Sequence, residues 1–185
     1  MTVGILGLQG CVRPHLSHFE TLGVQARRIL FPADLECLRG LVIPGGESST
    51  MLKTAPPDLW PAVAEFADTY PVWGICAGSI LLAREVENPA QDSLGLLDIS
   101  VRRNAYGAQN ESFCTTLDLE FPTPASGRFL FIRAPRITRV GEGLDVLARH
   151  EDTPVMVAGE RHMATTFHPE LSDDPVIHAH FLSRL

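Results

Sequence analysis

Short apolar runs alternate with stretches of helical spacing in the first half of the chain. The expected strands of this half are residues 2–8, 25–30, 41–43 and 72–75. The expected helices are residues 12–22, 59–69 and 77–86. This alternation predicts a parallel sheet that is covered by helices on both faces.

Beyond Gly95 the pattern changes to consecutive strand-like stretches. They are residues 96–102, 113–121, 128–132, 146–148, 155–158 and 162–167. Because consecutive strands cannot all be parallel without crossover helices, part of this half should form antiparallel hairpins. Residues 173–185 are expected as a closing helix with Ser172 as its N-cap, and residues 88–93 and 122–127 as exposed loops. The pattern predicts an α/β fold with a mostly parallel central sheet and antiparallel strands in the C-terminal half.

Length and composition narrow the class of protein. A chain of 185 residues suits one domain, spanning 1–185, with a sizeable core. No apolar stretch approaches the roughly 18 to 20 residues of a membrane span, and no basic segment precedes the apolar residues at the N-terminus. We therefore expect a soluble, cytoplasmic protein with no signal peptide and no membrane partner. The net charge of −7, without a basic cluster, argues against nucleic acid as a partner.

The four cysteines are widely spaced, with no C-x-x-C pair and no Cys/His cluster at metal-ligand spacing. This spacing argues against a metal site and against a disulfide framework. We expect free thiols, and we expect Cys11, Cys37 and Cys114 to be small buried hydrophobic residues. No cofactor is expected.

The fourth cysteine lies in a motif of its own. The sequence G-I-C-A-G at residues 74–78 follows an apolar run and precedes a helix-like stretch. Its serine counterpart, G-x-S-x-G, forms a sharp strand-to-helix turn that exposes the middle side chain. Such a turn would place Cys76 at a helix N-terminus, which favours a thiolate, and leave the N–H of Ala77 free to stabilise an oxyanion. The motif predicts a nucleophile; a buried structural cysteine is the alternative.

A thiolate nucleophile needs a base, and one histidine has a suitable context. His168 ends an apolar stretch and begins the sequence H-P-E. A strand delivers it, proline stiffens the exit, and Glu170 can return to hold one ring nitrogen. A capped strand end is the alternative. The other six histidines lie in helical, loop or terminal contexts and are expected at the surface or in structural roles: His15, His18, His150, His162, His178 and His180.

The sequence P-G-G-E-S at residues 44–48 ends another apolar run. Acyl transfer needs two N–H donors at the oxyanion, and glycine backbone at Gly45 and Gly46 can approach a ligand closely. A phosphate loop is the rival interpretation, but the lysine and the spacing of the known phosphate-binding motifs are absent. Ligands of open α/β sheets gather at the carboxyl ends of strands, where this motif, Cys76 and His168 are all expected.

Several segments together carry a family resemblance. They are LGLQG (6–10), PGGESSTM (44–51), GICAG (74–78), RNAYG (103–107), FIRAP (131–135) and HPE (168–170). The sequence resembles the class I glutamine amidotransferases and, more narrowly, the glutaminase subunits of pyridoxal 5'-phosphate synthase. The segments occur in the family order over nearly the whole chain. The resemblance implies a three-layer flavodoxin-like fold.

The resemblance also implies roles for individual residues. Cys76 would attack the side-chain amide of glutamine, His168 would carry the proton to ammonia, and Glu170 would orient His168. The implied glutamine site consists of Gly46, Glu47, Ser48, Arg103, Ile132 and Arg133, with an oxyanion hole made by the backbone of Gly46 and Ala77. Cationic and anionic side chains opposite each other would suit the α-carboxylate and α-ammonium of the free amino acid.

The implied partner is a barrel-type pyridoxal 5'-phosphate synthase subunit, which receives ammonia through a channel. In the family the glutaminase is poorly active alone, and docking is thought to set the backbone of Gly45 and Gly46. Pro14 departs from the family pattern and is acceptable only in a first helical turn. The alternatives are another triad glutaminase, such as the one that feeds imidazole glycerol phosphate synthesis, a cysteine peptidase or chaperone of related fold, and a catalytically silent partner-binding module.

Overall fold

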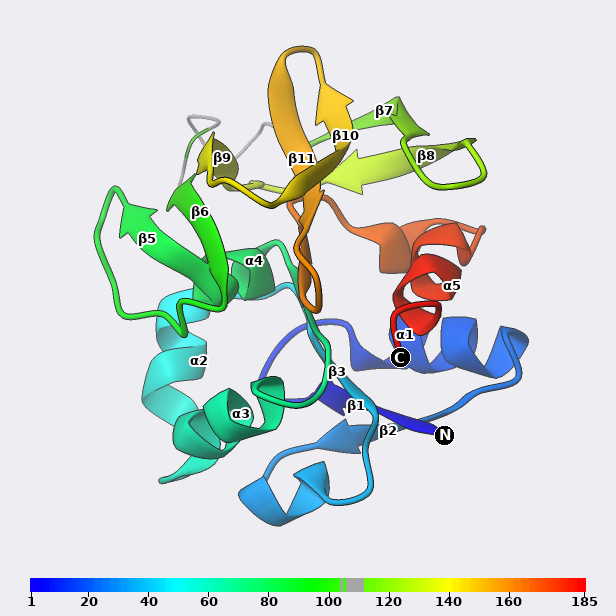
Figure 1. Ribbon diagram of the computed structural model, residues 1–185. Helices are drawn as coiled ribbons and strands as arrows, with labels where there is room; N and C mark the ends of the chain where they lie inside the picture. Colours follow the sequence, from blue (N-terminus) through cyan, green and yellow to red (C-terminus); the bar gives the residue numbers. More distant parts are fainter. Residues whose placement is uncertain (104, 106–111) are drawn as a thin grey trace.

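The computed structural model describes residues 1–103, 105 and 112–185. Within these residues the largest sheet has the strand order β10-β11-β12-β4-β3-β1-β2 (Figure 1). Its strands are β1 (Thr2–Leu6), β2 (Gln25–Ile29), β3 (Gly40–Ile43), β4 (Val72–Ile75), β10 (Asp145–His150), β11 (Thr153–Ala158) and β12 (Met163–Thr165). All pairings from β12 to β2 are parallel, whereas β10, β11 and β12 pair antiparallel. The predicted mostly parallel sheet with antiparallel strands in the C-terminal half is confirmed.

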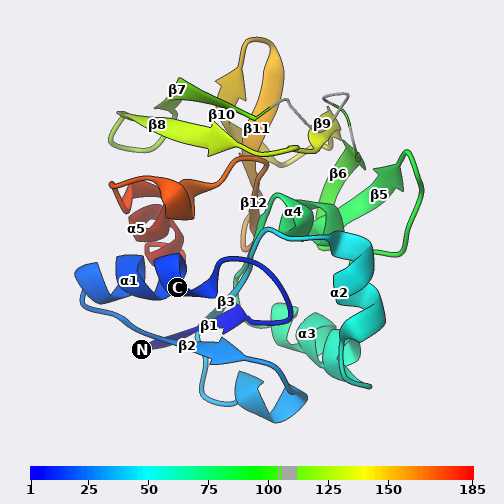
Figure 2. The same cartoon turned by 180° about the vertical axis from the view of Figure 1, so that it is seen from behind.

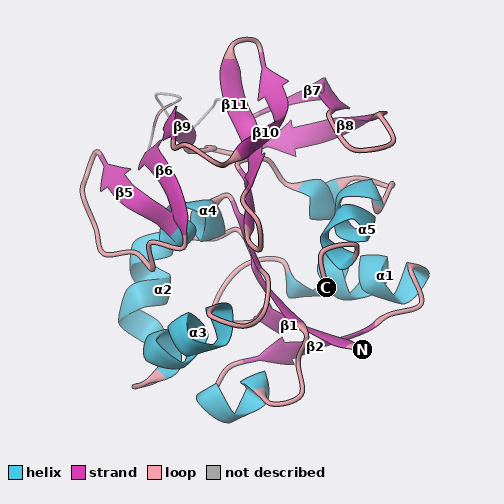
Figure 3. Cartoon of the chain, in the orientation of Figure 1, coloured by secondary structure: helices cyan, strands magenta, loops and turns pink. Residues whose placement is uncertain are grey.

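Helices cover both faces of this sheet, which gives the three layers expected from the sequence (Figure 2). One face carries α1 (Val12–Thr21) and α5 (Val176–Leu182), and the other carries α2 (Ser48–Thr54), α3 (Leu59–Ala67) and α4 (Ala77–Leu82) (Figure 3). Two short 3₁₀ helices are η1 (Pro32–Leu35) and η2 (Pro169–Leu171). In the described part of the chain, no helix is long and apolar enough to cross a membrane.

The central strands explain the apolar runs of the sequence. Every residue of β3 and of β4 is buried. Along β3, Leu41 and Ile43 belong to one core cluster, and Val42 belongs to the cluster on the opposite face. Because neighbouring side chains of a strand point to opposite faces, a strand between two helical layers must be apolar at every position.

The parallel strands follow the order β2-β1-β3-β4, which is the order of flavodoxin-like folds. The strand β2 lies on one side of β1, whereas β3 and β4 lie on the other side. A switch point of this kind lies between β1 and β3, and ligands of such sheets bind outside the carboxyl ends of the strands there. The loops after β1, β3, β4 and β12 therefore frame the expected site.

Two smaller sheets lie beside the main sheet. The first contains β5 (Ala83–Glu87), β6 (Leu97–Arg102) and β9 (Arg136–Val140), and the second is the hairpin of β7 (Phe113–Leu119) and β8 (Ala125–Phe131). The predicted helix over 77–86 is wrong after Leu82, because the chain continues as β5 and pairs in parallel with β6. The strand β9 was not predicted, since Ile137 is its one fully buried apolar residue.

Other boundaries also differ from the sequence predictions. The closing helix begins at Val176 instead of residue 173, and Ser172 is not its N-cap. The hydroxyl of Ser172 accepts a hydrogen bond from the N–H of Asp174, whose carboxylate accepts one from the N–H of Val176. Residues 88–93 form the expected loop, but the predicted loop over 122–127 ends early, because Ala125 already begins β8.

The four cysteines are free thiols, as predicted. The prediction that Cys11, Cys37 and Cys114 are buried is wrong, because all three are exposed. Cys11 precedes α1, Cys37 lies in a turn at φ 61°, and Cys114 lies on a hairpin where its sulfur accepts a hydrogen bond from Arg128. Cys76 is the buried one, with 7% of its surface exposed.

Candidate active site

Cys76 occupies a tight turn between β4 and α4. Its φ angle is 49°, a left-handed conformation that is unusual for a residue with a side chain. The turn requires glycine on both sides. A Cβ atom on Gly74 would lie 2.4 Å from the carbonyl oxygen of Gly78, and one on Gly78 would lie 2.0 Å from that of Ile43. The structure therefore contains the strained strand-to-helix turn that the motif predicted.

Hydrogen bonds fix the backbone of Cys76, and its side chain lines a pocket. The N–H of Cys76 donates to the carbonyl oxygen of Thr165 at 2.8 Å, and its own carbonyl accepts from the N–H and the hydroxyl of Ser79. The sulfur lies 3.9 Å from the carbonyl oxygen of Ile132. Ala77 is the first residue of α4, so its N–H has no acceptor within the helix.

His168 and Glu170 lie where β12 passes into η2. The ring nitrogen Nδ1 of His168 is 2.7 Å from Oε1 of Glu170, and both side chains are buried. Burial opposes a charge on His168, but the interactions of the ring with Cys76 and Glu170 outweigh it and raise the pKa of His168 to about 10. Burial likewise opposes the charge on Glu170, yet the hydrogen bond from His168 lowers the pKa of Glu170 below its usual value. The structure thus places the three side chains in series, with His168 hydrogen-bonded to Glu170 and interacting electrostatically with Cys76.

The glycine loop after β3 packs directly against this series. A Cβ atom on Gly45 would lie 2.5 Å from Cε1 of His168. Gly46 has a φ angle of 151°, which favours glycine. Gly10, at φ 90°, touches the Gly45 carbonyl oxygen so closely that a Cβ atom there would lie 1.9 Å from it. The two glycine loops after β1 and β3 therefore fit together beside His168.

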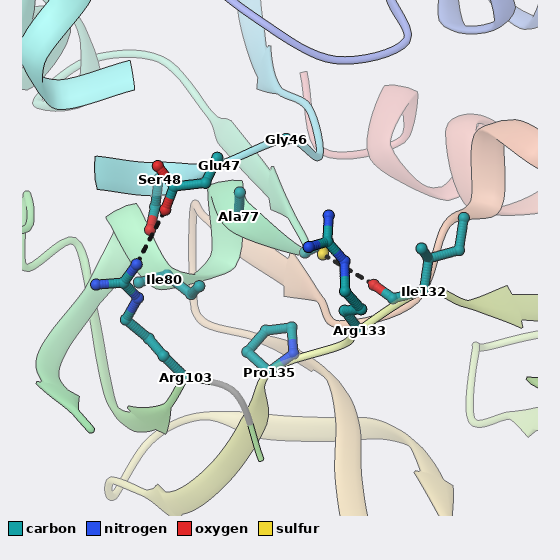
Figure 4. A pocket seen from close by; sticks show the side chains of 10 residues that line it. Gly46, Glu47, Ser48, Ala77, Ile80, Arg103, Ile132, Arg133 and Pro135 are labelled. Carbon is teal, nitrogen blue, oxygen red and sulfur yellow. Dashed lines mark hydrogen bonds and ion pairs between the residues drawn. The ribbon is translucent and has the colours of Figure 1, made fainter. Parts of the chain in front are cut away.

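A pocket of about 90 Å³ opens beside Cys76. It is lined by Gly46, Glu47, Ser48, Cys76, Ala77, Ile80, Arg103, Ile132, Arg133 and Pro135. Figure 4 shows Arg103 reaching Glu47 on one side of the pocket, with Ile132 and Arg133 on the other side. All six residues predicted for the glutamine site line this pocket, together with the cysteine and Ala77.

Glu47 caps the first turn of α2 and supplies negative charge at the pocket. Its carboxylate accepts hydrogen bonds from the N–H and hydroxyl groups of Ser49 and Thr50. It also forms an ion pair with Arg103 at 3.0 Å. Partial burial opposes the charge, but the hydrogen bonds from Thr50 and Ser49 lower the pKa of Glu47 to about 2. The carboxylate is therefore charged and held in place at neutral pH.

Two arginines supply positive charge. Arg103 is largely buried, with 13% of its side chain exposed, and its N–H donates to the carbonyl oxygen of Glu87. Arg133 is exposed at the pocket and has a φ angle of 44°. The remainder of the RNAYG motif, at residues 104 and 106–107, lies outside the described residues.

Sequence reasoning missed four residues of this region. Ile80 and Pro135 line the pocket, Gln9 accepts a hydrogen bond from the N–H of Glu47, and Gln91 accepts one from the hydroxyl of Ser48. Gln9 and Pro135 lie within the LGLQG and FIRAP motifs, so the motifs contained a signal for them. Ile80 and Gln91 have none, because each acquires its place only through the fold.

Comparisons with known proteins agree on the class. A family model described as the SNO glutamine amidotransferase family matches residues 5–185. A Solibacter usitatus protein named pyridoxal 5'-phosphate synthase subunit PdxT is 46% identical over 189 residues, which cover 99% of this chain and 98% of that protein. A protein of the same name from Deinococcus radiodurans is 47% identical over 192 residues, covering 98% of this chain and 96% of that protein.

Solved structures share the fold. A crystal structure of a glutamine amidotransferase matches with a TM-score of 0.88 at 39% identity, covering 98% of this chain and 97% of that one. A chain of the PurLQS structure from Thermotoga maritima matches with a TM-score of 0.72 at 16% identity, covering 98% and 97%. The three-layer fold with its cysteine turn is that of a glutamine amidotransferase. Within that class, the chain belongs to the SNO glutamine amidotransferase family.

The close contact at the cysteine turn predicts the effect of Gly78→Ala. The added methyl group would collide with the backbone of β3, so α4 must move outward. We expect a loss of about 1 to 3 kcal/mol in the free energy of unfolding and a loss of activity. Gly159→Ala is the control, because its Cβ atom would meet the ends of two side chains, those of Leu144 and Leu97, and no backbone atom. Equal stability of Gly78→Ala and the wild type in denaturant unfolding would contradict this packing.

The lowered pKa of Glu47 predicts a pH-dependent contribution to stability. Because the pKa in the folded state lies below the ordinary value of 4.5, the charged carboxylate stabilises the fold at neutral pH. This contribution should disappear as the pH falls from 4.5 towards 2. The thermal unfolding temperatures of the wild type and of Glu47→Gln should converge over this pH range. Thr50→Ala, which removes one hydroxyl donor to Glu47, should reduce the difference in unfolding temperature between chains with and without the Glu47→Gln change, while Thr50→Ser should preserve it. A difference that does not change with pH would contradict the lowered pKa of Glu47.

Proposed function

We propose that this chain hydrolyses L-glutamine to L-glutamate and ammonia through the triad of Cys76, His168 and Glu170. The observation that carries the proposal is the His168–Glu170 hydrogen bond next to Cys76, beside a pocket with both charges on its walls. The proposed glutaminase is a single domain over residues 1–185 that acts in the cytoplasm.

The chemistry divides into two acyl-transfer steps. The sulfur of Cys76 attacks the side-chain amide carbon of glutamine, and His168 accepts the thiol proton and delivers it to the departing ammonia. Water, deprotonated by the same histidine, then hydrolyses the glutamyl thioester and regenerates the thiol. The raised pKa of His168 supports its part as acceptor of the thiol proton, and Glu170 holds the ring in place through Nδ1.

Both tetrahedral intermediates need an oxyanion hole. The N–H of Ala77, at the start of α4, supplies one donor, and the backbone of Gly46 supplies the other. Glycine at positions 45 and 46 permits the peptide between them to adopt either orientation. The contact with Gly10 makes this choice depend on the loop after β1.

The walls of the pocket suit a free amino acid. Glu47, fixed by four donors of Ser49 and Thr50, would hold the α-ammonium group of glutamine. Arg133 and Arg103 would attract the α-carboxylate. Opposite charges at one end of a small pocket favour glutamine over glutaminyl residues within a peptide, whose α-groups are uncharged.

The names of the relatives suggest where the ammonia goes. Both proteins described above are named subunits of pyridoxal 5'-phosphate synthase. We infer that this chain supplies ammonia to a barrel-type subunit of such a synthase for vitamin B6 biosynthesis, with no nucleic acid or membrane as a partner. Docking would then set the Gly45–Gly46 peptide and complete the oxyanion hole.

An assay of glutamate release from glutamine tests this proposal. The chain should release glutamate strongly only with the barrel subunit of its own organism, because the oxyanion hole depends on docking. Cys76→Ala should abolish release with both subunits present, while Cys114→Ala should leave it unchanged, since that exposed thiol lies on the hairpin of β7 and β8.

Each other outcome of the assay has a defined meaning. High activity without the partner would keep the triad and contradict the gating by docking. Absence of activity in both cases, or full activity of Cys76→Ala, would contradict the proposal and favour a catalytically silent binding module. Activation by the glutaminase-dependent synthase of another pathway, and not by the barrel subunit, would assign the chain to a different triad glutaminase.

A further inference from the structure

Two buried histidines lie directly behind Glu170. His15, on α1, and His178, on α5, are both fully buried. Their ring nitrogens, Nδ1 of His15 and Nε2 of His178, are 2.8 Å apart. The two helices lie side by side on one face of the sheet (Figure 1 and Figure 2). From the sequence, both residues are expected at the surface or in structural roles, and no sequence pattern predicts their position beside Glu170.

The other ring nitrogen of His15 faces the triad. Nε2 of His15 lies 3.8 Å from Oε2 of Glu170, and neither atom has a hydrogen-bond partner among the described residues. The second oxygen of the same carboxylate, Oε1, is the one that accepts from His168. Buried polar atoms are nearly always paired, and a buried carboxylate oxygen without a donor is unfavourable. The separation of 3.8 Å is longer than a hydrogen bond, and catalytic contacts of this kind tighten when substrate binds.

The charge of Glu170 determines the direction of these hydrogen bonds. If His15 donated from Nδ1 to His178, its Nε2 would be a bare lone pair facing a carboxylate, which is repulsive. If His178 donates from Nε2 to Nδ1 of His15, the proton of His15 is on Nε2 and points to Glu170. The second arrangement makes every contact attractive, and Nδ1 of His178 is then the bare nitrogen.

Both histidines are neutral in this arrangement. Burial lowers the pKa of His15 to about 4, although Glu170 opposes the shift, and burial also lowers the pKa of His178 to about 2. The titratable groups near the pair are Glu170, His168 and, on α1, His18, whose ring centroid is 4.5 Å from that of His178. A neutral donor orients the carboxylate without neutralising it, so the full charge of Glu170 remains available to His168.

We propose that His15 is a positioning residue, which donates from Nε2 to Glu170 and is itself held in this tautomer by His178. The inference rests on the proposed function, because its effect is to keep Oε1 of Glu170 aimed at His168. The aromatic ring of Trp73 packs edge-on against both histidines and fixes their planes. In this role, neither histidine ring contacts the substrate.

Nitrogen NMR of the unmodified chain, with histidines labelled with ¹⁵N, tests the tautomers without any mutation. We expect His15 to be neutral at pH 7 with its proton on Nε2, and His178 likewise. A proton on Nδ1 of His15, or a charged His15 at pH 7, would overturn the inference. This result does not depend on glutaminase activity, so it separates the inference from the proposed function.

Kinetics of variants test the role. His15→Phe, which removes the donor, should lower kcat for glutamine by about tenfold in the complex with the synthase subunit, with KM unchanged. It should also shift or broaden the most downfield N–H resonance of His168. His15→Gln keeps an N–H donor and should recover most of the activity. His180→Phe, on the same helix as His178, is the matched control and should behave as the wild type.

The outcomes separate a positioning role from a packing role. Loss of activity in both His15→Phe and His15→Gln with the His168 resonance unchanged would overturn the inference and indicate packing alone. Equal activity of His15→Phe and the wild type would overturn it too. If His15→Phe does not fold, His178→Phe and the tautomer measurement decide, because removal of the His178 donor should allow the other tautomer of His15. An inactive wild type would contradict the proposed function and leave the tautomer result standing.

Discussion

The approach of α4 to the sheet depends on one contact, between Gly78 and the carbonyl oxygen of Ile43. A single added carbon atom would lie 2.0 Å from that oxygen. The contact brings the start of α4 against β3, next to the turn at Cys76 with its φ angle of 49°. This close approach helps to keep the sulfur, the N–H of Ala77 and the glycine loop after β3 near one another. The strain of the turn is stored where the chemistry is proposed.

The helix α1 and the loop before it both contact the proposed site. The loop before it contributes Gln9, which accepts a hydrogen bond from the N–H of Glu47, and Gly10, which touches the Gly45 carbonyl. Its first turns carry His15, which faces Glu170. Pro14 fits this helix because it is the third residue, where a backbone N–H would have no acceptor within the helix. A displacement of α1 would thus reach the glycine loop and the carboxylate together.

The sequence was sufficient for those features that depend on local pattern. The continuous apolar runs at 41–43 and 72–75 predicted the central parallel strands, and glycine on both sides of Cys76 predicted the turn. The spacing could not distinguish a helix from a strand at residues 83–86, because Ala83 and Val86 suit either. It could not reveal β9, which forms only by pairing with the distant strand β6. Nor could it reveal the exposure of Cys37, which depends on how the surrounding turn packs in the fold. His15 and His178 are 163 residues apart, so no local pattern could join them.

The central claim is that Cys76 is the nucleophile, and labelling by a glutamine analogue with a diazoketone group tests it most directly. The other three cysteines are exposed and Cys76 is 7% exposed, so unselective reaction would favour Cys11, Cys37 and Cys114. Peptide mass spectrometry of the labelled chain, in complex with its synthase subunit, should find the adduct on Cys76 alone, with protection by excess glutamine. An adduct on an exposed cysteine with Cys76 unmodified would contradict the account.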